Sequence, residues 1–330
     1  MNLTLTVALA AIALLPAPFA RAQPAGDPAS IWTLQDENAS VSRLKPRDHF
    51  YTNGLRLGWI SPTTAVPVAL ADFGRAVWGD GRQRVGFDLA QQIYTPMDTH
   101  ATIPNPRDRP YAGLLTGDAS LFSDTANTRS VLTLRFGVVG SWAGGGDIQN
   151  GFHDLIGRPE VKGWNGQVPN TPVVEVRHER TWRLPVGRIA GLDTDVLPSL
   201  TAGLGNLRDY VQAGATVRIG QGLDSDFGVP RLSPGLSGGD AYTPTRALAW
   251  YVFVGVDAQA VGYDLLLQAA PFRSGPHVSP LWDVGEMQAG AAIMTAGLRL
   301  TVAYVAQTVA FRTQCGGIHQ FGMAALSVRF

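Results

Sequence analysis

Hydrophobic and polar residues alternate with a period of two along most of the chain beyond about residue 30. One clear stretch begins at Tyr51, where the odd positions are Tyr51, Asn53, Leu55, Leu57 and Trp59 and the even ones are Thr52, Gly54, Arg56 and Gly58. Successive side chains of a strand point to opposite faces, so this stretch predicts a strand with Thr52 on its polar face. The apolar face would cover a core in a soluble sandwich, or face lipid in an outer-membrane barrel whose polar face lines the lumen.

The same alternation recurs about twelve times, separated by breaks rich in glycine and proline. The expected strands lie near residues 31–35, 51–59, 84–89, 111–122, 132–138, 174–179, 195–203, 210–219, 250–256, 283–293, 298–304 and 321–330. The apolar run 261–270 is interpreted as an extension of the ninth strand and its loop, because single-chain bacterial barrels usually have an even number of strands. In the sixth, Glu175, Arg177 and Glu179 share the inward face, where acid and base can pair. The pattern predicts an all-β, transmembrane, antiparallel up-and-down barrel.

The two ends of the chain support an exported protein. Residues 1–22 combine an apolar run with small residues before Gln23, which predicts a secretory signal peptide and leaves residues 23–330 as one outer-membrane barrel domain. The last predicted strand ends in Phe330, as is typical of barrels presented to the barrel-assembly machinery, an expected partner. If this strand ends in the periplasm, residues 38–50, 95–110 and 143–171 are extracellular loops at one rim, and 61–82 and 221–246 are periplasmic connections.

Composition narrows the class further. The 26 basic and 26 acidic residues balance, and loss of Arg21 with the signal leaves a net charge of −1, so nucleic acid is not an expected partner. No later apolar run reaches about 18 residues, and the lone Cys315 cannot form an internal disulfide. Lys45 and Lys162 are the only lysines, and arginine suits either a lumen laced with ion pairs or a phosphorylated ligand. A narrow barrel filled by such side chains disfavours a porin.

Polar motifs gather in the three predicted extracellular loops. They are Glu37-Asn38, Asp48, Tyr51-Thr52-Asn53-Gly54, Tyr94-Thr95-Pro96, Asp108-Arg109-Pro110-Tyr111-Ala112-Gly113, Gln149-Asn150, His153, Ile156-Gly157 and Gly163-Trp164. With this spacing the chain resembles the outer-membrane lipid A deacylases. The resemblance implies hydrolysis of the ester-linked 3′-acyloxyacyl chain of lipid A, with calcium as cofactor, at the extracellular face of a Gram-negative outer membrane. It also implies that His153, on a short loop helix, activates water while a metal stabilises the oxyanion, and that Asn38 and Thr52 belong to the site.

Two positions depart from the family pattern. Ala39 stands where an aspartate is expected after the asparagine, and Pro159 stands where a glutamate is expected, with Glu160 one residue later. Both changes remove carboxylate oxygens, and calcium sites are built from oxygen ligands. The candidate metal ligands are therefore Asp48 and Glu160, with Asp36 and Glu37 as further substitutes.

His153 is also a candidate without the resemblance. Ester hydrolysis at neutral pH needs a base that titrates near that pH, and imidazole supplies one. Phe152, Leu155 and Ile156 follow helical spacing and predict a short amphipathic helix at the lipid boundary. The sequence contains no G-x-S-x-G elbow, H-E-x-x-H zinc helix or P-loop.

Two alternatives remain open at this stage. One is a catalytically inactive structural or lipid-binding barrel that lost its metal site with Ala39, and the other is a phospholipase-type esterase. Several further polar and aromatic residues are expected to be structural. Asp108 and Arg109 are expected to tie a loop to the rim through an ion pair, His49 and His178 to have structural roles, and Trp32, Trp59 and Trp182 to form an interfacial aromatic belt.

Overall fold

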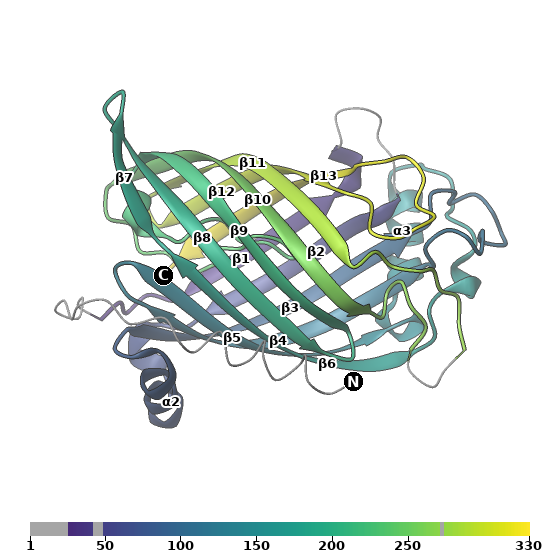
Figure 1. Ribbon diagram of the computed structural model, residues 1–330, viewed down its shortest axis with the longest axis horizontal. Coiled ribbons are helices and arrows are strands. Elements are labelled where there is room, and N and C mark those ends of the chain that lie inside the picture. Colours follow the sequence, from purple (N-terminus) through teal and green to yellow (C-terminus); the bar gives the residue numbers. More distant parts are fainter. Residues whose placement is uncertain (1–25, 42–48, 271–273) are drawn as a thin grey trace.

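The chain folds into a closed antiparallel β-barrel (Figure 1). The computed structural model describes residues 26–41, 49–270 and 274–330, so the predicted signal peptide lies outside the described residues. In this part of the chain the strands are Ile31–Asn38 (β1), Phe50–Ile60 (β2), Arg82–Thr95 (β3), Ala112–Asp124 (β4), Thr128–Val139 (β5), Thr171–Trp182 (β6), Leu184–Ile189 (β7), Leu192–Gly205 (β8), Arg208–Gln221 (β9), Leu248–Asp264 (β10), Asp283–Thr295 (β11), Leu298–Gln307 (β12) and His319–Arg329 (β13).

Twelve of these strands form the wall. Each pairs with its neighbour in the chain, β1 pairs with β13, and pairing of β6 with β8 closes the ring. The predicted twelve strands are confirmed, and β10 extends to Asp264 as expected. The short strand β7 was not predicted. It pairs only with β8, as a hairpin that projects beyond the wall in Figure 1, and all six of its residues are exposed.

The wall has an apolar outer face and a polar inner one. On β1, Trp32 and Leu34 are exposed, whereas Thr33, Gln35 and Glu37 are buried. In a bilayer the backbone polar groups of a closed barrel are paired between strands, so the exposed apolar side chains can face hydrocarbon. The predicted charge alternation on β6 is confirmed by an Arg177–Glu179 ion pair of 3.0 Å and by a second pair, 3.8 Å long, between Glu175 and Arg135 of β5.

Aromatic side chains mark the outer face near one end of the barrel. Trp32 and Trp59 are register partners on β1 and β2, and Trp59 stacks on Phe87 with 6.0 Å between the ring centroids. Tryptophan is enriched at membrane–water interfaces, where its ring meets both phases. This arrangement supports the expected aromatic belt for Trp32 and Trp59.

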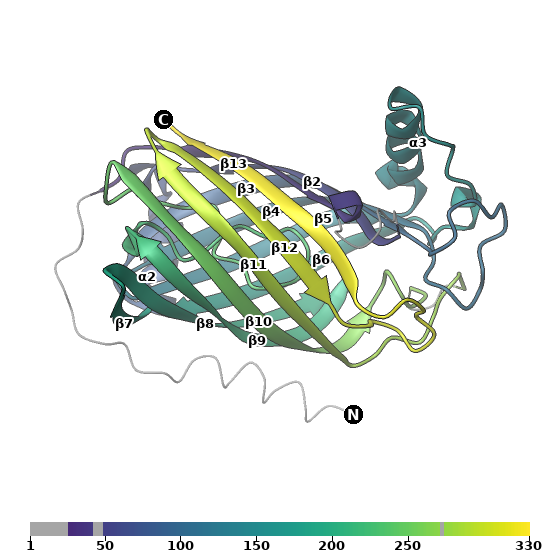
Figure 2. The same ribbon diagram turned by 90° about the horizontal axis from the view of Figure 1, so that it is seen from above.

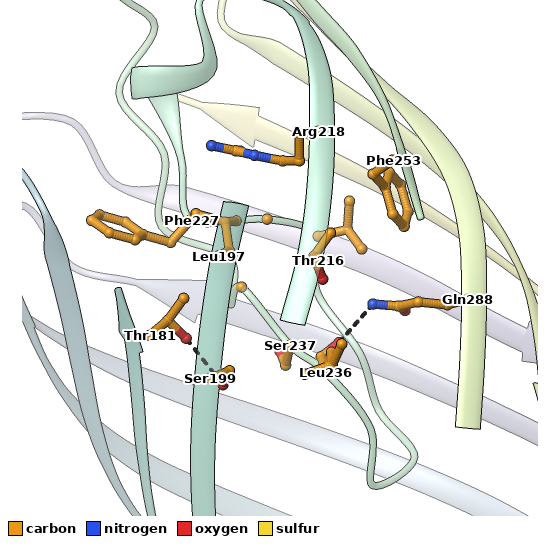
Figure 3. A pocket seen from close by; sticks show the side chains of 13 residues that line it. Thr181, Leu197, Ser199, Thr216, Arg218, Phe227, Leu236, Ser237, Phe253 and Gln288 are labelled. Atoms are coloured by element: carbon orange, nitrogen blue, oxygen red, sulfur yellow. Dashed lines mark hydrogen bonds between the residues drawn. The ribbon is translucent and has the colours of Figure 1, made fainter. Parts of the chain in front are cut away.

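The connection between β9 and β10 fills the lumen. Its residues Phe227, Val229, Leu232 and Leu236 are buried inside the wall, although residues 221–246 were expected to be an ordinary periplasmic connection. Figure 3 shows a pocket between this segment and the inner wall, in which Gln288 donates a hydrogen bond to the carbonyl of Leu236. That pocket and a second one beside it measure about 10 and 40 Å³, space for water molecules only.

Arginine–carboxylate pairs attach this segment to the wall. Arg231 Nη1 lies 2.8 Å from Glu286 Oε1, and its Nε lies 3.2 Å from Glu37 Oε1. Arg56 of β2 binds both carboxylate oxygens of Asp240, at 2.5 and 2.8 Å. Because buried charges are tolerated when paired and hydrogen-bonded, the lumen accepts many charges without becoming a water-filled pore.

The part of the chain that the structure describes has two α-helices, which lie at opposite ends of the barrel (Figure 2). Helix α2 (Val68–Trp78) follows β2, and helix α3 (Gly145–Leu155) follows β5. Trp78 at the end of α2 donates a hydrogen bond of 3.1 Å to His178 Nε2 and stacks on its ring, which gives His178 the structural role predicted for it. Among the described residues, no helix is both long and apolar enough to cross a membrane.

The predicted polar loops meet at one end. Residues 39–49, 96–111 and 140–170 connect strand ends on the side of α3, here called the α3 end, whereas Phe330 lies at the other end (Figures 1 and 2). Asn38, Thr52 and His153 therefore lie at the same end of the barrel.

Four short 3₁₀ segments lie in connections between strands, and a fifth, Leu223–Ser225 (η5), begins the lumen segment. The four are Ala39–Val41 (η1), Thr63–Ala65 (η2), Ser141–Ala143 (η3) and Trp164–Gly166 (η4).

We expect Arg231→Met to destabilise the barrel by about 3–5 kcal/mol, because it leaves Glu37 and Glu286 buried without their cation. The free energy of unfolding from a urea titration in detergent micelles measures this effect. Arg75→Ala is the matched control, since its ion pair with Asp72 is exposed and should contribute little. Equal stability of the two variants would contradict this role for Arg231.

Candidate active site

A β-bulge changes the register of β2 at the α3 end of the barrel. The register between β2 and β3 shifts between Tyr51 and Asn53, so Thr52 is an extra residue opposite its partner strand. The Thr52 hydroxyl lies 2.8 Å from the hydroxyl of Thr95. By the alternation along β3, Thr95 lies on the same face as the exposed residues Phe87 and Leu89. The expectation that Thr52 lies on the inward face is therefore wrong, because the bulge turns it to the outer wall.

Polar side chains continue across β1 on the same outer face. Asn53 Nδ2 donates to Asp36 Oδ1 at 2.8 Å and to the carbonyl of Glu37 at 3.2 Å. Asn38, the register partner of Asn53, accepts a 2.8 Å hydrogen bond from the Ser40 backbone N–H. Polar groups are costly on a lipid-facing wall, so this group of Asp36, Asn38, Thr52, Asn53 and Thr95, here called the outer polar group, indicates a site.

Glu37 points the other way. Its two carboxylate oxygens accept backbone N–H bonds from Leu232 at 2.9 Å and Ser233 at 3.1 Å, in addition to the ion pair with Arg231. Although Glu37 precedes Asn38 in the sequence, it attaches the lumen segment to the wall. Glu37 thus does not replace the lost carboxylate of the outer polar group.

Helix α3 packs against the outer wall where β3 ends and β4 begins. A Cβ added at Gly145 would lie 2.8 Å from the Gly113 Cα, so glycine at this position permits the close approach of helix and strand. Trp164 donates to Gln149 Oε1 at 3.1 Å and packs on Tyr111. Buried Gly145, Gln149 and His153 follow one another at four-residue spacing, so one stripe of the predicted amphipathic helix faces the protein.

The C-terminal end of α3 fixes the ring of His153. Gly157 has a φ of +67°, its N–H bonds to the Asp154 carbonyl at 3.2 Å, and the Arg158 N–H bonds to the His153 carbonyl at 2.8 Å. This Schellman ending reverses the chain, and the Pro159 carbonyl then lies 2.8 Å from His153 Nδ1. A carbonyl only accepts, so Nδ1 carries the proton and Nε2 is the basic nitrogen of the neutral ring.

The structure describes only some of the candidate metal ligands. Asp48 lies outside the described residues, Glu160 is exposed beyond the end of α3, and Ala39 is fully buried and has no side-chain oxygen. Among the described residues, no group of three or more His, Cys, Asp or Glu could hold a metal ion. Calcium binding therefore stays a prediction.

The Asp108–Arg109 motif supports the rim in a different way from that expected. Asp108 Oδ2 accepts the Met97 backbone N–H at 2.7 Å, and the Arg109 guanidinium lies 4.5 Å from the centre of the Tyr94 ring. These contacts replace the predicted ion pair. Burial lowers the pKa of Arg109 and raises that of the neighbouring Tyr111 well above its usual range, so the Tyr111 hydroxyl stays neutral.

Sequence reasoning named Asp36 only as a substitute metal ligand, gave Asn53 and Thr95 no role of their own, and did not predict that the three lie together in the outer polar group. Their signal was available, since Asp36 and Asn53 share the alternation of exposed Leu34 and Leu55. Polar residues on an otherwise lipid-facing alternation mark a place where the wall does more than face hydrocarbon.

Comparisons with known proteins agree with this architecture. The model of the family described as "Outer membrane protein LpxR" matches residues 3–330. The solved structure of LpxR from Salmonella typhimurium has a TM-score of 0.74 and 22% identity, covering 90% of this chain and 99% of that one. The beta domain of the Bordetella autotransporter Brka has a TM-score of 0.41, 12% identity and coverages of 92% and 99%. The translocator domain of the autotransporter NalP from Neisseria meningitidis has a TM-score of 0.38 and 10% identity, covering 94% of this chain and 90% of that one. No curated protein matches the sequence.

We expect Gly145→Val to lift α3 from the wall, because its side chain would collide with Gly113 and Trp164. Hydrogen exchange of residues 145–155 should then accelerate strongly while the strands stay protected. Gly151→Ala in the same helix is the matched control, since a Cβ there meets nothing within 4 Å. Unchanged protection of α3 in Gly145→Val would show that the helix is held in another way.

Proposed function

The chain belongs to the LpxR family of outer-membrane proteins, and we propose that it hydrolyses the ester-linked 3′-acyloxyacyl chain of lipid A. One observation carries this proposal. The outer polar group and the buried His153 of α3 lie on the outer wall at one end of the barrel, not in the filled lumen. A membrane lipid can reach that face directly from the bilayer, whereas a soluble substrate of a lumen enzyme would need an open pore.

In the proposed reaction His153 is the general base. Its Nε2 takes a proton from water as the water oxygen bonds to the ester carbonyl carbon, and the imidazolium returns a proton to the sugar oxygen as the C–O bond breaks. His153 lies in the last turn of α3, with its side chain buried against the protein. Asn38 and Thr52 would orient the water and the ester through their amide and hydroxyl groups.

We assign the α3 end to the cell surface. Barrels of this kind have short periplasmic turns and longer extracellular loops. Most connections at the α3 end are long, whereas the other end has the short turns between β4 and β5 and between β11 and β12, beside the long β2–β3 and β9–β10 connections. The terminal Phe330 would then lie in the periplasm, where the barrel-assembly machinery acts. Lipid A of the outer leaflet would meet the outer polar group at this rim.

Calcium dependence remains a prediction of the family resemblance. In the outer polar group, Asp36, Asn38 and Thr52 carry side-chain oxygens, and those of Asp36 and Asn38 already accept protein hydrogen bonds. When bound, calcium would polarise an ester carbonyl as a Lewis acid. We derive no step through it.

We expect His153→Gln to lower lipid A deacylation at least about a hundredfold, since general-base catalysis typically contributes that much or more. Mass spectrometry of lipid A incubated with the purified barrel measures the released chain. His277→Gln is the matched control, because His277 is exposed and its ring contacts only a local carbonyl. A fully active His153→Gln variant would exclude this mechanism.

We expect a chelator to abolish deacylation by the full-length protein and added calcium to restore it. This experiment also addresses the two alternatives, with glycerophospholipid supplied beside lipid A. An inactive barrel that lost its metal site with Ala39 releases no fatty acid under any condition, and a phospholipase-type esterase releases it from the glycerophospholipid. Full activity on lipid A in the chelator would show that the reaction needs no calcium.

A further inference from the structure

An apolar hollow of about 360 Å³ indents the outer wall beside the outer polar group. It lies over β11, β12 and β13, under the short segment η1. Its lining comes mainly from Val41, Ala289, Val302, Tyr304, Gly322 and Ala324, with Asp36 at its edge. We call it the wall groove.

Small residues on the outward alternation create the groove. The outward residues beside the groove are large, such as Met287 on β11 and Leu326 on β13. Within the groove the outward positions hold only Ala289, Gly322 and Ala324. Val41 covers the hollow from η1, and a Cβ added at Gly322 would lie 2.6 Å from Val41 Cγ1. Glycine at position 322 thus lets η1 fold closely over the wall.

The position of the groove defines what can fill it. It is continuous with the exposed apolar outer face of an outer-membrane barrel, through Val302, Leu300 and Leu326. Apolar cavities of about 150 Å³ already stay dry and bind small hydrophobic molecules. The occupant available at that face is the acyl chain of a lipid.

The groove and His153 lie on opposite sides of β1. Asp36 lines the groove and accepts the hydrogen bond from Asn53, and Gly322 is the register partner of Asn38. Helix α3 lies in the other direction, against β3 and β4. A lipid whose ester lies over β1 and β2 can therefore extend one chain into the groove while His153 approaches from the other side.

We propose that the wall groove holds the acyl chain that the proposed deacylation releases, an inference that rests on the proposed function. A lipid chain gains little hydrophobic free energy on moving from bilayer to protein, so the groove would act through close packing that positions the ester. Its consequence is a preference for the length of the released chain.

Ala324→Leu fills the groove with an apolar side chain that a lipid-facing position tolerates. Ala213→Leu is the matched control, because Ala213 is an exposed outward residue of β9 and lies outside the groove. We expect Ala324→Leu to lower the ratio of deacylation rates for long and shortened released chains about tenfold, and Ala213→Leu to leave it unchanged. Equal ratios in both variants would overturn the inference.

A second readout needs no catalysis. In a His153→Gln background, native mass spectrometry of the full-length barrel in detergent measures retained lipid A, which Ala324→Leu should reduce and Ala213→Leu should not. If the wild-type protein releases no chain but retention still depends on Ala324, the groove stands and the proposed function fails. If the wild-type protein hydrolyses lipid A and neither readout distinguishes the variants, the groove inference fails and the function stands.

Discussion

The structure depends on the need to pair every backbone polar group of a strand that crosses hydrocarbon. Most strands pair with their neighbours in the chain. Two further pairings, of β1 with β13 and of β6 with β8, join strands that are not consecutive and close the barrel. In the closed barrel, successive side chains of each strand therefore face the lipid and the lumen in turn. Consecutive residues then have unrelated roles: Glu37 holds the lumen segment, whereas Asn38 lies on the outer wall.

The charged side chains of the lumen are paired and closely packed. Arg218 contacts Asp195 and Asp226 at 2.6 Å each, and Arg299 reaches the same Asp226 at 3.3 Å. Planar guanidinium groups can satisfy two carboxylates at once, which fits a chain whose cations are almost all arginine. The segment between β9 and β10 completes this packing, so the barrel is a rigid support for its outer surface.

Local alternation was enough to predict the strands and their closure, but not the features that break a period of two. The bulge at Thr52 adds one residue and reverses the face of everything before it, and the sequence carries no separate mark of that shift. The lumen segment resembles a surface connection in its glycine and proline content, and its partners, such as Glu37 and Arg56, lie far away in sequence. The helix around His153 was predictable because its spacing is local.

On the outer wall, a backbone carbonyl stands where the family pattern has a carboxylate. Pro159 occupies the position of an expected glutamate, yet its carbonyl orients His153 by accepting the Nδ1 proton. The orientation of the His153 ring is thereby built into the backbone ending of α3, where Gly157 reverses the chain. Any residue would provide such a carbonyl, and proline is well suited to this place because it cannot continue the helix. Proline at position 159 therefore lacks a candidate carboxylate ligand but still supports the His153 ring through its carbonyl.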